Sequence, residues 1–322
     1  IFLLYTTLRG APIELVGPDG FRGLGHIDSR QDTLTIDITL RRPLAEDALT
    51  EKQSSKGQPQ SGKKGRRLEE EEIVKTFTLA QDKTALRSRS GDTGSVLWRA
   101  SVELARVILQ QNAFLSTNSL PLFNGATLAN THVLELGCVP TGTGLLGAAL
   151  SPLVRTYTLT DVSALLPLLR KNVALNLAST TSDPDSASRS SLNNVVVEPL
   201  DWELANHPTT KPSAQRINHH NTSHSSDEQH LHVDADPKYT LVLAIDCIYH
   251  PSLLPALVDT LCAATPPGAW ALVLAELRAE DVLREFLARW LDGECDGWKI
   301  WALRGVVGVH YALWVGLRTM RA

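Results

Sequence analysis

One stretch of the chain joins an apolar segment to a glycine-rich turn and the start of a helix. Residues 132–147 read HVLELGCVPTGTGLLG, and Gly142 to Gly147 fit the pattern GxGxxG. Glycines at such a turn let the backbone approach a ligand closely, and the free amides of the following helix can hold an anionic group. The pattern alone is weak, but it indicates a site for a nucleotide-containing cofactor.

An acidic residue follows this turn at a suitable separation. Asp161 ends the next apolar segment, TYTLTD. It lies at about the 20-residue distance that nucleotide sites use, where a carboxylate accepts hydrogen bonds from both ribose hydroxyls. Because Asp161 directly precedes a predicted helix, it can also act as a helix N-cap, and the two roles are compatible. We favour the ribose role because the glycine loop comes before it.

Two tryptophans are placed to form walls of the same site. Trp202 follows a predicted strand in VEPLDWE, and it can either pack against an adenine ring or close the core at its rim. Trp98, in GSVLWRAS, comes just before the first helix of the α/β region. It either forms a wall of the cofactor pocket or covers the edge of the sheet.

A second acidic residue and an aromatic one follow a later strand, in the sequence AIDCIY. Ligands of open α/β sheets bind outside the carboxyl ends of the strands, where the strand order reverses. An ionised Asp246 there can attract a substrate cation, and Tyr249 offers an aromatic face and a hydroxyl. A helix cap with a packing aromatic would use the same residue types, so both interpretations stay open.

Alternating strand-like and helical segments must position these residues, which predicts an α/β fold. The predicted strands are residues 132–137, 156–161, 195–200, 239–246, 270–276, 298–303 and 310–317. The predicted helices are residues 98–111, 145–150, 162–178, 251–264 and 280–291. The last two strands follow each other without a helix, and so short a link makes them antiparallel. We therefore expect a seven-stranded, mostly parallel, Rossmann-like sheet with its last strand antiparallel.

Residues 1–92 have β-like signals and are predicted to form a small N-terminal β extension. Residues 33–40 and 73–79 alternate apolar and polar side chains. Between them, residues 51–72 contain a KKGRR run and four consecutive glutamates, with too few apolar residues to offset the entropy of ordering. We expect a disordered hairpin tip, whose basic run is either a solvated charge cluster or a nuclear signal or RNA-phosphate contact.

The α/β domain, residues 93–322, is predicted to carry two polar inserts, at residues 179–194 and 207–237. Histidines are concentrated in the second insert, but a polar loop has no surrounding groups to orient metal ligands, so we predict no metal site. The four cysteines have no CxxC spacing. They are predicted to be buried, reduced thiols rather than a disulfide framework or a zinc site.

Composition excludes several classes of protein. The 322 residues are 43% hydrophobic and carry a formal net charge of −4, which argues against direct binding of nucleic acid. No apolar run reaches the roughly 20 residues of a membrane span, and the opening IFLLY is too short for a signal peptide. The chain starts at Ile1 and its only methionine is Met320. We therefore expect a missing or processed N-terminus. We also expect the protein to be a monomer and to be located in the cytoplasm, with the nucleus as an alternative.

The motifs TGSVLW, VLELG…GTGLLG, LTD, PLDWE and AIDCIYHPSLL together resemble the seven-β-strand lysine methyltransferases of family 16. The resemblance is strongest from Gly94 to Leu254 and includes that family's Asp/Glu-x-x-Tyr/Phe signature, matched by Asp246 and Tyr249. It implies a class I methyltransferase fold, S-adenosyl-L-methionine as methyl donor and a protein lysine as acceptor. The fungal ribosomal branch of the family is most similar, which implies a lysine of large-subunit ribosomal protein L1.

The resemblance also implies roles for single residues. The implied cofactor-binding residues are Trp98, Glu135, Gly137, Gly142, Gly144, Asp161, Trp202 and the backbone of Ile245. Asp246 and Tyr249 are implied to frame the access of the lysine, Asp246 by orienting the amine and Tyr249 by packing along its stem. One departure from the family is the segment CVPT between Gly137 and Gly142, which makes the glycine loop two or three residues longer than in ELGxGxxG.

Two other functions fit parts of the pattern. An NAD-type oxidoreductase would use the GxGxxG run and Asp161, but the helix-free final strand pair and the lack of a plausible hydride-site residue argue against it. A non-catalytic methyltransferase-like adaptor would result if the lengthened loop no longer holds cofactor and the β extension binds a partner.

Overall fold

The computed structural model describes most of the chain. The described residues are 1–10, 25–28, 30–42, 71–82, 96–114, 122–123, 125–137, 143–177, 194–205, 239–292 and 297–319. Both predicted polar inserts, apart from Asn194, and the predicted tip, apart from Glu71 and Glu72, lie outside these residues.

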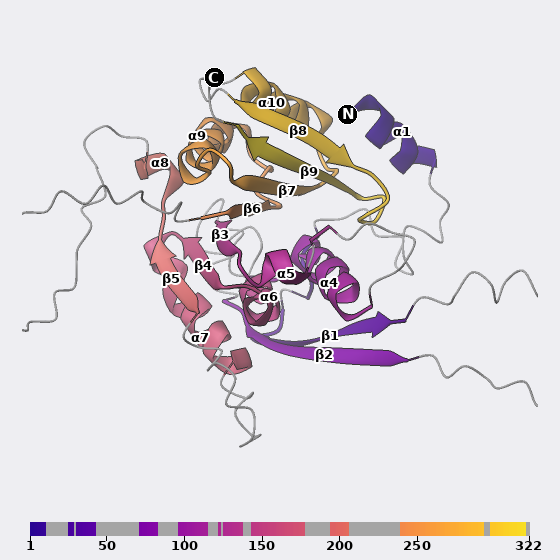
Figure 1. Ribbon diagram of the computed structural model, residues 1–322, viewed down its shortest axis with the longest axis vertical. Helices are drawn as coiled ribbons and strands as arrows, with labels where there is room; N and C mark the ends of the chain where they lie inside the picture. The colour runs from indigo at the N-terminus through magenta and orange to yellow at the C-terminus, as the bar shows by residue number, and fades with distance from the viewer. Residues whose placement is uncertain are drawn as a thin grey trace, which may run out of the picture.

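A seven-stranded sheet forms the centre of the molecule (Figure 1), in the order β5-β4-β3-β6-β7-β9-β8. Its strands are β3 (His132–Leu136), β4 (Thr156–Asp161), β5 (Val195–Pro199), β6 (Leu241–Ile245), β7 (Trp270–Glu276), β8 (Trp298–Leu303) and β9 (Tyr311–Arg318). Strands β3 to β7 pair in parallel, and β9 is antiparallel to both of its neighbours. The predicted fold is therefore confirmed, including the reversed last strand.

Helices cover both faces of the sheet, which explains why its central strands are apolar throughout. One face carries α4 (Arg99–Ala113), α5 (Gly125–Leu128), α6 (Leu145–Leu150) and α7 (Leu166–Leu177). The other carries α1 (Phe2–Gly10), α8 (Trp202–Ala205), α9 (Leu254–Ala264) and α10 (Glu280–Asp292). In Figure 1, α9 and α10 lie above the sheet and α4, α6 and α7 below it. Short 3-10 turns at Ser151–Leu153, Ser163–Leu165 and Pro251–Leu253 precede or follow these helices.

The N-terminal residues contradict the prediction of a purely β-like extension, because Phe2–Gly10 form helix α1. Ile1, Leu4, Tyr5 and Leu8 have the spacing of one helical face, and they pack into the core that also contains α9 and α10. The opposite face leaves Phe2 and Leu3 exposed. The predicted strands of the extension are confirmed as β1 (Thr33–Arg41) and β2 (Glu72–Ala80), an antiparallel hairpin.

Two asparagines of α7 dock this hairpin onto the α/β domain. The side chain of Asn172 accepts a hydrogen bond from the Ala80 amide at 2.7 Å and donates one to the Ala80 carbonyl at 3.0 Å. Asn176 makes the same two bonds with Thr78, at 2.9 and 2.8 Å. Residues four apart on a helix rise about 6 Å, and residues two apart on a strand about 6.6 Å. The two amides therefore meet alternate backbone groups of β2, as a neighbouring strand would.

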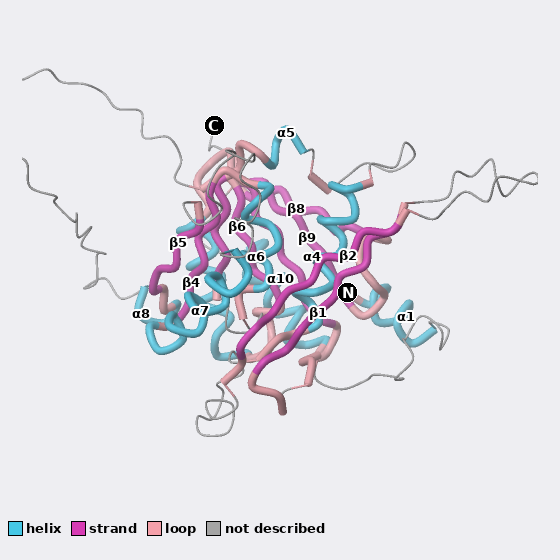
Figure 2. Tube along the Cα trace, turned by 90° about the horizontal axis from the view of Figure 1, so that it is seen from below, coloured by secondary structure: helices cyan, strands magenta, loops and turns pink. Residues whose placement is uncertain are grey.

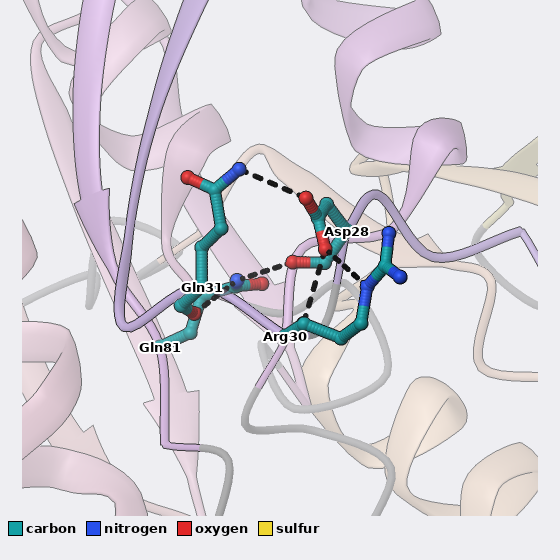
Figure 3. Close-up of polar contacts among 4 residues, drawn as sticks. All are labelled: Asp28, Arg30, Gln31 and Gln81. Atoms are coloured by element: carbon teal, nitrogen blue, oxygen red, sulfur yellow. Dashed lines mark hydrogen bonds and ion pairs between the residues drawn. The ribbon is translucent and has the colours of Figure 1, made fainter.

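A third amide, that of Gln81, joins the hairpin to the residues before α4, and Figure 3 shows its hydrogen bonds to Asp28 and Gln31. Gln81 donates hydrogen bonds to the carbonyls of Asp28 and Gln31, at 3.0 and 2.9 Å, and accepts one from the Leu97 amide at 2.9 Å. The Asp28 carboxylate in turn accepts hydrogen bonds from Gln31 and Arg30, which lower its pKa. These bonds hold residues 25–28 beside Trp98, and Figure 2 shows the hairpin running across the helices of its face.

We predict that Asn172→Ala lowers the free energy of unfolding by about 2–4 kcal/mol, because it leaves buried backbone groups without partners. Asn172 is fully buried and also donates to the Thr143 carbonyl at 3.0 Å. Urea denaturation followed by circular dichroism measures the change. Leu175→Ala, at a position 42% exposed on the same helix, is the matched control. Equal losses for the two variants would contradict the docking role.

Candidate functional site

A pocket of about 140 Å³ opens at the carboxyl ends of the parallel strands. Gly137 follows β3, Asp161 ends β4, Trp202 begins α8 after β5, and Tyr249 follows β6, and all four line the pocket. The structure thus brings together four of the residues that the sequence analysis selected. Parallel pairing places these strand ends at one edge of the sheet, where ligands of α/β folds bind.

Gly137 and Trp202 are in close contact inside this pocket. Gly137 has a φ of +57°, and a Cβ at this position would lie 2.2 Å from Cζ2 of the Trp202 indole. Only glycine satisfies both conditions, the left-handed backbone and the missing side chain. The Trp202 side chain is buried and also belongs to the core around α9, so the wall and rim roles coincide. Among the described residues, no group accepts a hydrogen bond from its indole Nε1.

Asp161 holds its carboxylate at the pocket wall. Its side chain is 2% exposed, and Oδ1 accepts a hydrogen bond from the Val162 amide at 2.6 Å. The N-cap of the following 3-10 turn is Val162, not Asp161, so the alternative role of Asp161 as a helix N-cap is wrong. The reason is that the chain stays extended at Val162, with a ψ of 144°, and enters the turn one residue later.

The remaining residues implied for the cofactor lie elsewhere or outside the described part of the chain. Glu135 is fully buried within the sheet, where its carboxylate accepts a hydrogen bond from the Tyr157 hydroxyl at 2.8 Å. Gly144 has a φ of +73° and is the N-cap residue before α6, facing Leu169. Ile245 is buried at the end of β6. Gly142 is not among the described residues.

A second cluster at the same edge of the sheet surrounds a cation; its members are Trp98, Asp246, Glu276 and Arg278, and we name it the cation cluster. Nη2 of Arg278 lies 2.5 Å from Oδ2 of Asp246 and 2.8 Å from Oε2 of Glu276. The guanidinium carbon lies 4.6 Å from the centre of the Trp98 ring, within the range of cation–π attraction. The Glu276 amide also donates to Oδ1 of Asp246 at 3.2 Å.

Arg278 and Glu276 were missed by the sequence analysis. Their signal was present in the sequence AELR, because Glu276 is the last residue of β7 and Arg278 follows it by two positions. Strand β7 pairs in parallel with β6, so its carboxyl end necessarily lies beside Asp246. Among the strand ends, only those of β3, β4, β5 and β6 were predicted to carry site residues.

The charges of the cation cluster are strongly coupled. Burial raises the pKa of Asp246 to about 6, in spite of the attraction of Arg278. Burial acts to lower the pKa of Arg278, but Asp246 and Glu276 together raise it. Both groups are therefore ionised at neutral pH. Asp246 also has a φ of +54°, a conformation that is uncommon for a residue with a side chain.

Asp246 and Tyr249, expected to act side by side, belong to different groups of side chains. Tyr249 lines the pocket, whereas the Asp246 carboxylate is bound to Arg278. Cys247 between them is buried, and its thiol donates weakly to the Leu136 carbonyl at 3.4 Å. Burial raises its pKa well above the usual value, as expected for a reduced thiol. Cys262 is likewise buried, and Cys138 and Cys295 lie outside the described residues.

The part of the chain that the structure describes contains neither a membrane-spanning helix nor a cluster of metal ligands. None of the helices seen there has both the length and the apolar character needed to cross a membrane. Over the same residues, no three His, Cys, Asp or Glu side chains come together in a way that would hold a metal ion.

Comparison with known proteins shows what the chain is similar to. Residues 80–217 match the model of a family described as lysine methyltransferase. The chain is 32% identical over 217 residues to a Schizosaccharomyces pombe protein named diaminohydroxyphosphoribosylamino-pyrimidine deaminase, covering 67% of this chain and 42% of that protein. It is 26% identical over 297 residues to ribosomal lysine N-methyltransferase 5 of Candida glabrata, covering 83% of this chain and 82% of that one.

Solved structures of low identity also align with the chain. The DhpI–SAH complex is 16% identical, with a TM-score of 0.37, over 68% of this chain and 86% of that one. The fibrillarin pre-rRNA processing protein of Methanococcus jannaschii is 10% identical, with a TM-score of 0.37, over 76% of this chain and 90% of that one.

The family match supports a methyltransferase that uses S-adenosylmethionine. The similarity to the deaminase does not extend to a zinc site of the deaminase kind. Zinc-dependent nucleobase deaminases hold their metal partly through a CxxC pair. This chain contains no CxxC, and it spans less than half of that relative.

We predict that Gly137→Ala lowers the free energy of unfolding by about 1–3 kcal/mol and changes the near-ultraviolet circular dichroism of tryptophan. The added Cβ must displace the Trp202 indole. Backbone strain from an alanine at positive φ would not by itself move that indole. Gly305→Ala is the matched control, because Gly305 has a φ of +71° but no atom within 4 Å of the new Cβ. Identical spectra for the two variants would contradict the contact.

We predict that the stability of the protein relative to its Asp246→Asn variant falls as pH rises from about 4 to 6. The pKa of Asp246 rises from 3.8 in the unfolded chain to about 6 on folding. The folded state then binds the proton more tightly, so this contribution is full below pH 4 and lost above pH 6. At about 1.4 kcal/mol per pH unit, the loss is about 3 kcal/mol.

Urea denaturation at several pH values measures this difference in the free energy of unfolding. Asp292→Asn, at an exposed position on α10, is the control and should show no such trend. A difference between protein and variant that stays constant over this pH range would contradict the raised pKa.

Proposed function

We propose that this chain is an S-adenosylmethionine-dependent protein-lysine N-methyltransferase that acts on a lysine of large-subunit ribosomal protein L1. The observation that carries the proposal is the pocket in which Asp161 and the Gly137–Trp202 contact meet at the carboxyl edge of the sheet. The match of residues 80–217 to the lysine methyltransferase family supports the same reaction.

The pocket residues fit the adenosine part of the cofactor. The Asp161 carboxylate would bind the ribose hydroxyls, and the Trp202 indole would flank the adenine, with its Nε1 as a further donor. Because Gly137 has no side chain, the Trp202 indole lies directly against the backbone at the end of β3, where both residues line the pocket. At about 140 Å³ the pocket is smaller than the roughly 300–1,000 Å³ of most ligand sites, which suits one part of the cofactor.

When bound, S-adenosylmethionine supplies an electrophilic methyl group for transfer to a neutral amine. A lysine has a pKa near 10.4 in water, so the site must favour loss of its proton; apolar surroundings do this by desolvation. Tyr249, at the pocket wall, would pack along the lysine stem. Asp246 would attract and orient the incoming ammonium, because its carboxylate is ionised at neutral pH. Holding the two reactants in line supplies much of the rate enhancement.

The acceptor is proposed from the relative in Candida glabrata, whose name specifies a ribosomal lysine. That relative aligns along most of both chains. We further propose that the protein is a monomer of the cytoplasm, where ribosomal proteins are made, and that it binds its substrate without contacting nucleic acid.

We predict that S-adenosylhomocysteine binds the protein and that Trp202→Ala weakens this binding about tenfold or more, since base–aromatic stacking is lost. Isothermal titration calorimetry measures the dissociation constants. Trp301→Ala is the control, because Trp301 lies on β8 and is 45% exposed. Binding of NAD instead would favour the oxidoreductase, and no binding of either ligand would favour the adaptor.

We predict that labelled S-adenosylmethionine transfers its methyl group to ribosomal protein L1. The protein is incubated with the labelled donor and with ribosomal proteins from a strain that lacks the activity, and the labelled band is identified by mass spectrometry. A label on another protein would contradict the acceptor but keep the reaction. An Asp246→Ala variant that keeps full turnover at saturating S-adenosylmethionine would contradict the role of Asp246 in the acceptor site.

A further inference from the structure

We propose that Arg278 occupies the place of the acceptor's ammonium in the resting protein, so that only a lysine presented by a docked protein displaces it. The inference rests on the proposed function and adds a determinant of specificity to it. Arg278 would act as an internal competitor that excludes free amines from the acceptor site.

The cation cluster has the composition of a binding site for an external cation. Two carboxylates, from Asp246 and Glu276, and the face of Trp98 surround one guanidinium. Carboxylates and a tryptophan face are also the groups that recognise an alkylammonium ion. With two anions and one cation, the cluster keeps a net negative charge and therefore attracts a second cation.

Access to this cluster passes through Arg278. The Asp246 side chain is 1% exposed, whereas those of Arg278 and Glu276 are 20% and 13% exposed, so Arg278 forms the larger part of the open side. An ammonium ion reaches Asp246 only after the guanidinium has moved. The movement is favoured by the incomplete bonding of Arg278, whose buried Nε finds no acceptor among the described residues.

Competition of this kind discriminates between acceptors. For a free amine, the site is already occupied by Arg278. The apparent affinity of the amine is then its intrinsic affinity multiplied by the fraction of molecules in which Arg278 has left the site. A lysine on a protein that is bound elsewhere has a high effective concentration, so it can displace Arg278. The acceptor class is therefore a lysine within a docked protein, not a small amine.

The first test measures binding of n-butylammonium, without turnover, by tryptophan fluorescence. Arg278→Met should bind it about tenfold more tightly than the wild type, because the competing guanidinium is gone while stem contacts remain. Arg278→Lys should resemble the wild type. Arg284→Met is the matched control, since Arg284 is 67% exposed and pairs only with Glu280 among the described residues. Equal binding by wild type and Arg278→Met would overturn the inference.

The second test uses steady-state kinetics with the protein acceptor. Arg278→Met should lower the KM for the acceptor severalfold and leave the dissociation constant of S-adenosylhomocysteine unchanged. A fall in kcat at constant KM would show that Arg278 only orients Asp246, and would overturn the inference. Wild-type protein that transfers no methyl group would contradict the proposed function alone, because the first test does not depend on turnover.

Folding of the variants is checked by circular dichroism before either test. If Arg278→Met does not fold, Arg278→Gln replaces it, because a neutral amide still donates hydrogen bonds to Asp246 and Glu276. The same increase in n-butylammonium binding is expected, and its absence would again overturn the inference.

Discussion

Parallel pairing of β3 with β4 and β6 is the constraint on which the rest of the structure depends. It brings the carboxyl ends of these strands to one edge of the sheet, although Gly137, Asp161 and Asp246 are far apart in the chain. The pairing requires apolar strands covered by helices on both faces, and β6 with its sequence LVLAI satisfies this condition. The polar residues that follow each strand are then free to form a site.

Two groups of side chains share this edge and are suited to different ligands. One is the pocket around Gly137 and Trp202, where a flat aromatic surface lies against bare backbone. The other is the cation cluster, in which buried carboxylates meet a guanidinium. They are joined by the short segment that runs from Asp246 to Tyr249. A nucleoside on one side and an amine on the other would therefore meet across this segment.

The sequence predicted most of the fold because hydrophobic periodicity reports the burial of each element. Every predicted strand after Leu97 is present in the structure. Where the observed bounds differ from the predicted ones, as at β6, they do so by one or two residues at the strand ends. Helix α1 was missed because a run of apolar residues as short as IFLLY does not distinguish a helix from a strand. The docking amides of Asn172 and Asn176 were also missed, since a polar residue on a helix gives no sign of its distant partner.

For the site, the sequence identified residues at the ends of strands, but it did not show which of their side chains come together. Gly137, Asp161, Trp202 and Tyr249 meet in one pocket, as expected of residues that follow parallel strands. Glu135 and Gly144 were included because they belong to the same motif, but side-chain direction places one inside the sheet and the other against the core. Asp246 pairs with Arg278 and has a backbone at positive φ, a conformation that no local sequence pattern predicted.

The way the hairpin is attached bears on how the protein can be shortened. Leu34, Ile38, Phe77 and Leu79 of the hairpin belong to the same core as α4 and α7. A fragment beginning at residue 93 would expose the apolar side chains of these helices to solvent. It would also leave the Asn172 side chain without its hydrogen bonds to the Ala80 backbone. The division at residue 92 is thus a boundary in the sequence but not in the folding unit, and truncated forms intended for crystallisation need to retain both strands.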